Sequence, residues 1–129
     1  MSEVPEDLRG GSTEVTKVGG RVLRRRRQGS ANVEWLLTVL ECRGFRYSPR
    51  FLGLSDDDRQ VLGFIEGQTG SYPLSEELRS DEVLVSAARA LNSLHEATSD
   101  LATKVVDGWM LTAVEPYEVV CHGDFAPYN

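Results

Sequence analysis

The chain has 129 residues, a formal net charge of −6, 40% hydrophobic residues and 26% charged residues. This length suits one modest core, and the composition is that of a globular protein and excludes general disorder. The acidic balance argues against general binding to nucleic acid or to an anionic membrane, so any anionic ligand must be held locally.

Cysteine usage and the N-terminus predict a cytoplasmic, soluble protein. Cys42 and Cys121 lie far apart and lack C-x-x-C spacing, which indicates neither a disulfide framework nor a structural zinc site. The first residues, MSEVPEDLRGGS, lack the basic start and apolar stretch of a secretory signal. No apolar run reaches the roughly 20 residues of a membrane span.

The first third of the chain predicts a hairpin and a helix after a flexible lead-in at residues 1–12. The segment EVTKVGGRVLRRR has two short strand patterns around Gly19–Gly20, a pair suited to a tight turn. A helix is expected from about Asn32 to Arg43, with Gly44 placed to end it. Its apolar residues follow the i, i+3, i+4, i+7 spacing of one helical face and are Val33, Leu36, Leu37 and Leu40.

A second hairpin and a boundary are expected next. In RFLGLSDDDRQVLGFIEGQ two apolar runs flank Asp56–Asp58, a turn signal whose carboxylates can bond their own backbone. Gly67, Gly70 and Pro73 then interrupt the pattern, which predicts a boundary between two lobes at about residues 66 to 74.

The remaining chain predicts a helix, a strand and a final loop. Helical spacing relates four apolar residues, and Ser80 is the expected N-cap, with Glu82 in the first turn. Residues 101–111 are helical or irregular, and YEVVCH is typical of a short buried strand that leads into the last loop. The four apolar residues are Leu84, Ala87, Ala88 and Leu91.

The last loop contains His122, Gly123 and Asp124, then four residues and Asn129. This His-Gly-Asp-x4-Asn pattern resembles the catalytic loop of the aminoglycoside phosphotransferase and choline kinase family, relatives of the protein kinases. The resemblance implies an α+β, protein-kinase-like fold. Residues 13–67 would form the small lobe, with an antiparallel sheet, one helix and the hinge. Residues 68–129 would be a partial large lobe that ends in the catalytic loop.

The resemblance also implies roles for the loop residues. Asp124 would be the base that orients the acceptor hydroxyl, and Asn129 would help to bind Mg²⁺. His122 would shape the loop through hydrogen bonds. The alternative interpretation is a solvent-exposed turn, because Gly-Asp and Pro-Tyr-Asn are common turn formers.

Nucleotide-binding residues follow from the same resemblance. Backbone groups of Phe64, Ile65 and Glu66, in VLGFIEGQ, would hold the adenine of ATP (or the base of GTP), although a plain edge strand is an equal alternative. Arg24 takes the place of the phosphate-binding lysine of the family, and Glu34 is its candidate partner. The arginine run at 24 to 27 is equally typical of a solvated strand end.

Two functions of different classes follow. The first is an ATP-dependent phosphotransferase that moves the γ-phosphate to a hydroxyl of a small molecule, incomplete here because the resemblance covers about the first half of a family member. The second is a catalytically inactive, kinase-like interaction module. For this second function we expect self-association through apolar surface that the partial large lobe exposes.

Overall fold

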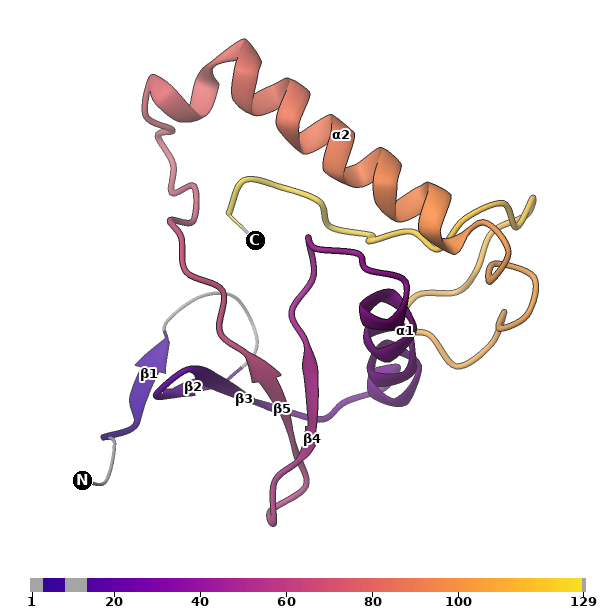
Figure 1. Cartoon of the computed structure of the whole chain (residues 1–129), viewed down its shortest axis with the longest axis horizontal. Helices are drawn as coiled ribbons and strands as arrows, with labels where there is room; N and C mark the ends of the chain where they lie inside the picture. The colour runs from indigo at the N-terminus through magenta and orange to yellow at the C-terminus, as the bar shows by residue number, and fades with distance from the viewer. Residues whose placement is uncertain (1–3, 9–13, 129) are drawn as a thin grey trace. The chain divides into compact units, whose positions relative to one another are not determined.

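The computed structural model describes residues 4–8 and 14–128 of the chain (Figure 1). The chain divides into two compact units. Unit 1 consists of residues 1–65 and 108–110, and unit 2 of residues 66–107 and 111–129.

Unit 1 is built on an antiparallel sheet. In the described part of the unit the strands follow the order β1-β2-β3-β5-β4, and every neighbouring pair is antiparallel (Figure 1). Sheet and helices together confirm the α+β class. The strands are β1 (Glu6–Leu8), β2 (Val15–Val18), β3 (Arg21–Arg25), β4 (Phe51–Leu54) and β5 (Arg59–Gly63).

Both predicted hairpins are confirmed, and each turns where the sequence indicated. Gly19 has φ 58° between β2 and β3, a left-handed conformation that glycine adopts without strain. Asp58 has φ 59° between β4 and β5, and acidic side chains tolerate that region better than most. Strand β1 was not predicted, because residues 6–8 fall inside the expected flexible lead-in at residues 1–12. Residues 1–3 and 9–12 of that lead-in lie outside the described residues.

The predicted first helix is confirmed as α1 (Ser30–Cys42), and Gly44 follows it with φ 74°. Leu37 and Leu40 of the expected apolar face are buried, together with Leu62 of strand β5. Full burial of one such side chain is worth about 1.5–3 kcal/mol. Packing of this helix therefore contributes to the core of unit 1.

Unit 2 contains a short 3-10 helix, η1 (Glu77–Arg79), and the helix α2 (Asp81–Thr98). The predicted N-cap is confirmed, since the Ser80 Oγ accepts a hydrogen bond of 3.3 Å from the Val83 backbone N–H. The buried side of α2 differs from the expected face: Leu84 is 68% exposed. Burial is greatest at and just beyond the C-terminal end of α2, at Thr98, Leu101 and Ala102.

The predicted strand YEVVCH is wrong, because residues 117–122 form no strand. The Val120 N–H instead donates to the Thr98 Oγ1 at 3.1 Å, while that hydroxyl donates to the Leu94 carbonyl at 2.8 Å. A side-chain acceptor on α2 therefore satisfies an amide that was expected to join a strand ladder.

Two further observations concern the expected cellular setting. Cys42 and Cys121 are free and exposed. In the described ranges, neither helix has the length and hydropathy that crossing a membrane would require.

Candidate functional site

The loop that carries the sequence pattern lies at the surface of unit 2. Gly123 has φ 83°, so a residue with a side chain would be strained there. The Asp124 N–H donates to the His122 Nδ1 at 3.3 Å. The Tyr128 hydroxyl donates to the Asp124 Oδ1 at 3.1 Å.

Four large side chains near this loop are between 50 and 66% exposed and form what we call the exposed patch: Tyr72, Leu111, Phe125 and Tyr128. The rings of Tyr72 and Tyr128 lie with their centroids 6.2 Å apart. Phe125 packs edge-on against the ring of His122, with centroids 5.7 Å apart. The Cδ1 of Leu111 lies 3.2 Å from the position that a Cβ on Gly123 would take. Two residues of the patch, Phe125 and Tyr128, therefore belong to the Asp124 loop, and Tyr72 and Leu111 lie against it.

Gly70 holds the end of the loop in place. Its N–H donates to the Pro127 carbonyl at 2.6 Å. A Cβ at position 70 would come within 2.7 Å of the same carbonyl oxygen and 3.1 Å of the Leu74 Cδ2. Only glycine permits this close approach, so the segment around residue 70 and the loop are packed against each other.

The electrostatics of the loop are those of an exposed carboxylate beside a phenol. The hydrogen bond to Asp124, and then the negative charge of that carboxylate, raise the pKa of the Tyr128 hydroxyl above its ordinary value. Tyr128 thus stays protonated, and stays a donor to Asp124, at physiological pH.

The other loop predictions remain untested. Asn129, the predicted Mg²⁺ ligand, lies outside the described residues. Among the residues that the structure describes, no three His, Cys, Asp or Glu side chains are grouped so as to hold a metal ion. ATP or GTP and Mg²⁺ stay predictions, as do the assigned roles of His122 and Asp124.

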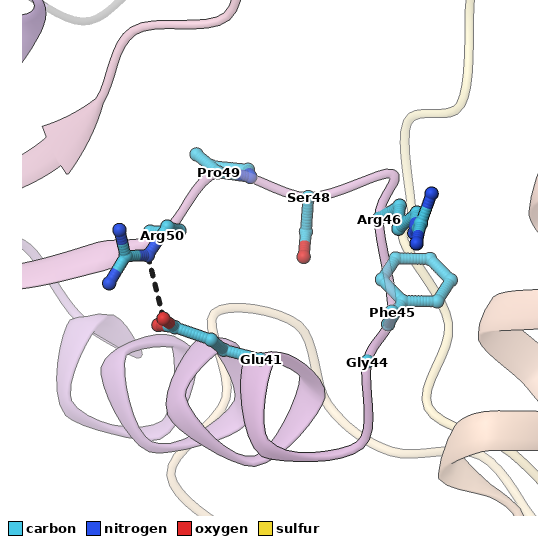
Figure 2. Close-up of a pocket in the computed structure, with 7 residues that line it drawn as sticks. All are labelled: Glu41, Gly44, Phe45, Arg46, Ser48, Pro49 and Arg50. Carbon is cyan, nitrogen blue, oxygen red and sulfur yellow. Dashed lines mark hydrogen bonds and ion pairs between the residues drawn. The ribbon is translucent and has the colours of Figure 1, made fainter.

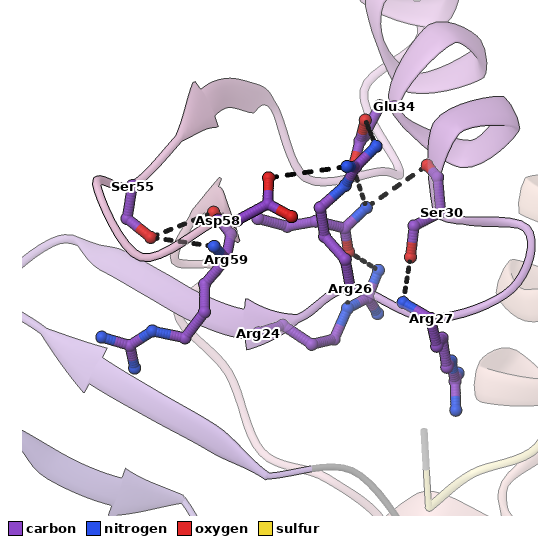
Figure 3. A network of polar contacts seen from close by, with 9 residues as sticks. Arg24, Arg26, Arg27, Ser30, Glu34, Ser55, Asp58 and Arg59 are labelled. Atoms are coloured by element: carbon purple, nitrogen blue, oxygen red, sulfur yellow. Dashed lines mark hydrogen bonds and ion pairs between the residues drawn. The ribbon is translucent and has the colours of Figure 1, made fainter.

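Unit 1 contains a polar network centred on Gln60, which is 0% exposed. Figure 3 shows the side chains of Arg24, Arg26 and Glu34, which belong to this network. The Arg24 Nε and Nη2 donate to the Gln60 Oε1 at 3.0 and 2.8 Å. The Gln60 Nε2 donates to the Glu34 Oε1 at 3.0 Å. Arg26 forms the direct ion pair with Glu34, through Nε at 2.8 Å and Nη2 at 3.1 Å. Asp58 lies 3.5 Å from the other side of the Arg26 guanidinium.

The network corrects the expected pairing of Arg24 with Glu34. Both residues belong to it, but Gln60 joins them and Arg26 is the ion-pair partner of the carboxylate. Burial, followed by the nearby charge of Arg27, lowers the pKa of the Arg24 guanidinium from its ordinary value. Gln60 was not predicted from the sequence, although its alternation with the buried Leu62 along β5 is the pattern of an inward-facing amide.

Of the three residues predicted to hold adenine, Phe64 already uses its backbone N–H in a hydrogen bond within unit 1. The Phe64 N–H donates to the Gly20 carbonyl at 3.0 Å, and the Lys17 Nζ lies 4.1 Å from the centre of the Phe64 ring. Ile65 and Glu66 are exposed. Because its amide already has a partner, Phe64 lacks the free donor that this role would use, while the prediction for Ile65 and Glu66 stays open.

An open hollow of about 330 Å³ lies between the end of α1 and the start of β4 (Figure 2). Phe45 lines it, and the Arg50 Nε forms an ion pair of 2.6 Å with the Glu41 Oε1 on another side. None of the residues predicted from the sequence to bind a ligand line this hollow.

Comparison with known proteins identifies one kind of relative. The chain is 33% identical over 129 residues to a trifolitoxin immunity protein from Rhizobium leguminosarum bv. trifolii. The similarity extends over 93% of this chain and 47% of that protein, so the chain spans about half the length of the relative. No family model and no solved structure matches the chain.

This similarity overturns the predicted family and activity. Three predictions are wrong, since the matching protein is an immunity protein. They are membership of the aminoglycoside phosphotransferase and choline kinase family, the small-molecule kinase activity and the alternative function as a kinase-like interaction module. The physical reason is that the His-Gly-Asp-x4-Asn pattern consists of few residues, most of them common in turns. Its described part forms an exposed turn, which was the alternative interpretation of these residues.

Proposed function

We propose that this chain acts in immunity to trifolitoxin and does so by binding the toxin. The observation that carries the proposal is the 33% identity to a trifolitoxin immunity protein along 93% of the chain. An immunity protein that works by binding needs a surface that is accessible and already arranged for its ligand. The features of unit 2 support such a surface.

The exposed patch has the properties of a binding surface. Grouped, exposed apolar side chains are uncommon on a protein without a partner, and tyrosine and phenylalanine are enriched at interfaces. The loop beneath the patch is held by the Gly70 bond to Pro127 and by the Thr98 bond to Val120. Because these bonds already order the loop, less conformational entropy is lost when a ligand binds.

The finer assignment of the fold is also a proposal. Along the chain, α1 follows β3 and precedes β4, and both strands belong to one antiparallel sheet. This order of elements supports a kinase-like small lobe for unit 1. This proposal concerns the fold alone and implies no reaction. An experimental structure of the chain in which α1 does not pack on the sheet would contradict it.

Protection of a sensitive bacterium tests the proposed immunity. A trifolitoxin-sensitive strain that produces this chain should survive higher toxin concentrations than the strain with an empty vector. A strain that produces the Rhizobium relative is the positive control. The double substitution Phe125→Ser with Tyr128→Ser should remove the protection, while Leu52→Ser on strand β4 should keep it. Full accumulation of the folded chain without any protection would contradict the proposal.

Recovery of the toxin tests the mode of action. Toxin that has been incubated with the purified chain, in the presence of ATP and Mg²⁺, should return from denatured samples with an unchanged mass. It should also elute together with the folded chain in size-exclusion chromatography. A change in toxin mass would contradict protection by binding.

A further inference from the structure

The two units carry opposite charge. Unit 2 contains 11 acidic and 3 basic side chains, a formal charge of −8, whereas unit 1 contains 9 acidic and 11 basic side chains, a formal charge of +2. The acidity of the whole chain therefore comes from the unit that carries the exposed patch. A ligand near that patch meets an attractive field only if the ligand is cationic.

The patch itself combines apolar area with negative charge. Asp124 lies within it, fixed to Tyr128 by the 3.1 Å hydrogen bond. Tyrosine and phenylalanine rings present faces of negative potential, on which an ammonium or guanidinium group is stabilised. The same rings can cover apolar side chains of a ligand, and removal of this apolar area from water favours binding.

We propose that the exposed patch of unit 2 binds a cationic amphipathic peptide segment, with its apolar side chains against Tyr72, Leu111, Phe125 and Tyr128 and a basic group at Asp124. The inference rests on the proposed immunity function and names the chemical class of the ligand. Charge complementarity favours this occupant over the same patch of a second copy, because each copy of unit 2 carries a formal charge of −8. Nucleic acid and anionic membranes are disfavoured for the same reason.

Three probe peptides separate the two contributions. The first has about 14 residues, long enough to form a helix on contact, with leucine on one face and lysine on the other. In the second peptide glutamate replaces every lysine, and in the third serine replaces every leucine. Calorimetry with the full chain should detect binding of the Lys/Leu peptide. Each of the other two peptides should bind at least about tenfold more weakly than the Lys/Leu peptide. A tenfold loss corresponds to about 1.4 kcal/mol of binding free energy.

Protein variants place the binding site. The pair Tyr72→Ser and Phe125→Ser should weaken binding of the Lys/Leu peptide about tenfold, because both rings belong to the patch. The matched pair Leu52→Ser and Leu54→Ser, which removes two exposed apolar side chains from unit 1, should leave the affinity unchanged. Asp124→Asn should weaken binding about twofold to fivefold at low salt and have less effect at high salt, where exposed charges are screened.

Clear outcomes overturn the inference. Equal binding of the Glu/Leu peptide would exclude the role of charge. Unchanged binding by the Tyr72 and Phe125 variant, with a native circular dichroism spectrum, would exclude the patch. A stable dimer in sedimentation that the same variant converts to monomer would identify a second copy as the occupant.

The probe experiment is independent of the immunity experiment. If the Lys/Leu peptide binds as predicted but the chain gives no protection against trifolitoxin, the ligand class stands and the immunity function falls. If the chain protects the strain but the probe does not bind, the immunity function stands and the present inference falls.

Discussion

Tyr128 and Asp124 form a hydrogen bond of 3.1 Å between a phenol donor and a carboxylate acceptor, four residues apart in one loop. This bond connects the exposed patch with the acidic side chain that would receive a basic group of the ligand. It also makes Tyr128 a reporter of the loop, because the ionisation of a phenol can be followed by its ultraviolet absorbance.

We expect Tyr128 to ionise at a higher pH than an ordinary tyrosine, whose pKa is about 10. The pKa is raised because the protonated phenol donates to Asp124 and because the carboxylate repels the phenolate. The interaction is therefore fully present below about pH 10 and is lost as the pH rises through the folded pKa of Tyr128.

A difference titration of the native chain against Tyr128→Phe measures this pKa. Asp124→Asn should lower it towards the ordinary value, since the substitution removes the charge. A midpoint that is the same with aspartate and with asparagine at position 124 would contradict an effect of the Asp124 charge on Tyr128.

Thr98→Val should destabilise unit 2 by about 1–3 kcal/mol, because valine has nearly the shape of threonine but leaves the Val120 N–H without its acceptor. The matched control is Thr38→Val, since the Thr38 hydroxyl also bonds a carbonyl one turn earlier but is exposed. Urea unfolding gives the free energies, and hydrogen exchange should show faster exchange of the Val120 amide only in the first variant. Equal free energies of unfolding for the two variants would contradict the buried role of Thr98.

Gln60→Leu should destabilise the chain by at least about 1–3 kcal/mol. Leucine fits the volume of glutamine but cannot accept from Arg24 or donate to Glu34, so the half-buried Arg24 guanidinium loses two of its bonds. Gln68→Leu, the same change at an exposed position, should have little effect on the free energy of unfolding. If thermal unfolding shifts equally in the two variants, the network does not stabilise unit 1.

Gly70→Ala should displace the loop that carries the exposed patch, because the new methyl group would overlap the Pro127 carbonyl. Gly20→Ala is the matched control: nothing lies within 4 Å of its Cβ position, and its φ is not in the left-handed region. Backbone amide shifts in nuclear magnetic resonance should move around Pro127 and Tyr128 for Gly70→Ala. Shifts confined to residues next to position 70 would contradict the close packing of the two segments.

Short-range chemistry made several elements predictable from the sequence. The Gly19–Gly20 turn, the acidic turn before β5 and the Ser80 cap each depend on groups within about four residues of one another. The spacing of Leu37 and Leu40 predicted the buried face of α1 for the same reason. Such features involve residues that are close in the sequence, so their residue types and spacing are sufficient to predict them.

Tertiary structure decided the features that depend on distant partners. Gln60 becomes the centre of a network only because β5 lies beside β3 and brings the amide to Arg24, 36 residues away in the chain. Val120 bonds to Thr98 instead of joining a ladder, and the exposure of Leu84 depends on what packs against α2. The sequence by itself determined the local turns, the Ser80 cap and the apolar face of α1. Which polar groups meet, and which apolar side chains stay in water, is set by packing between segments that no local pattern specifies.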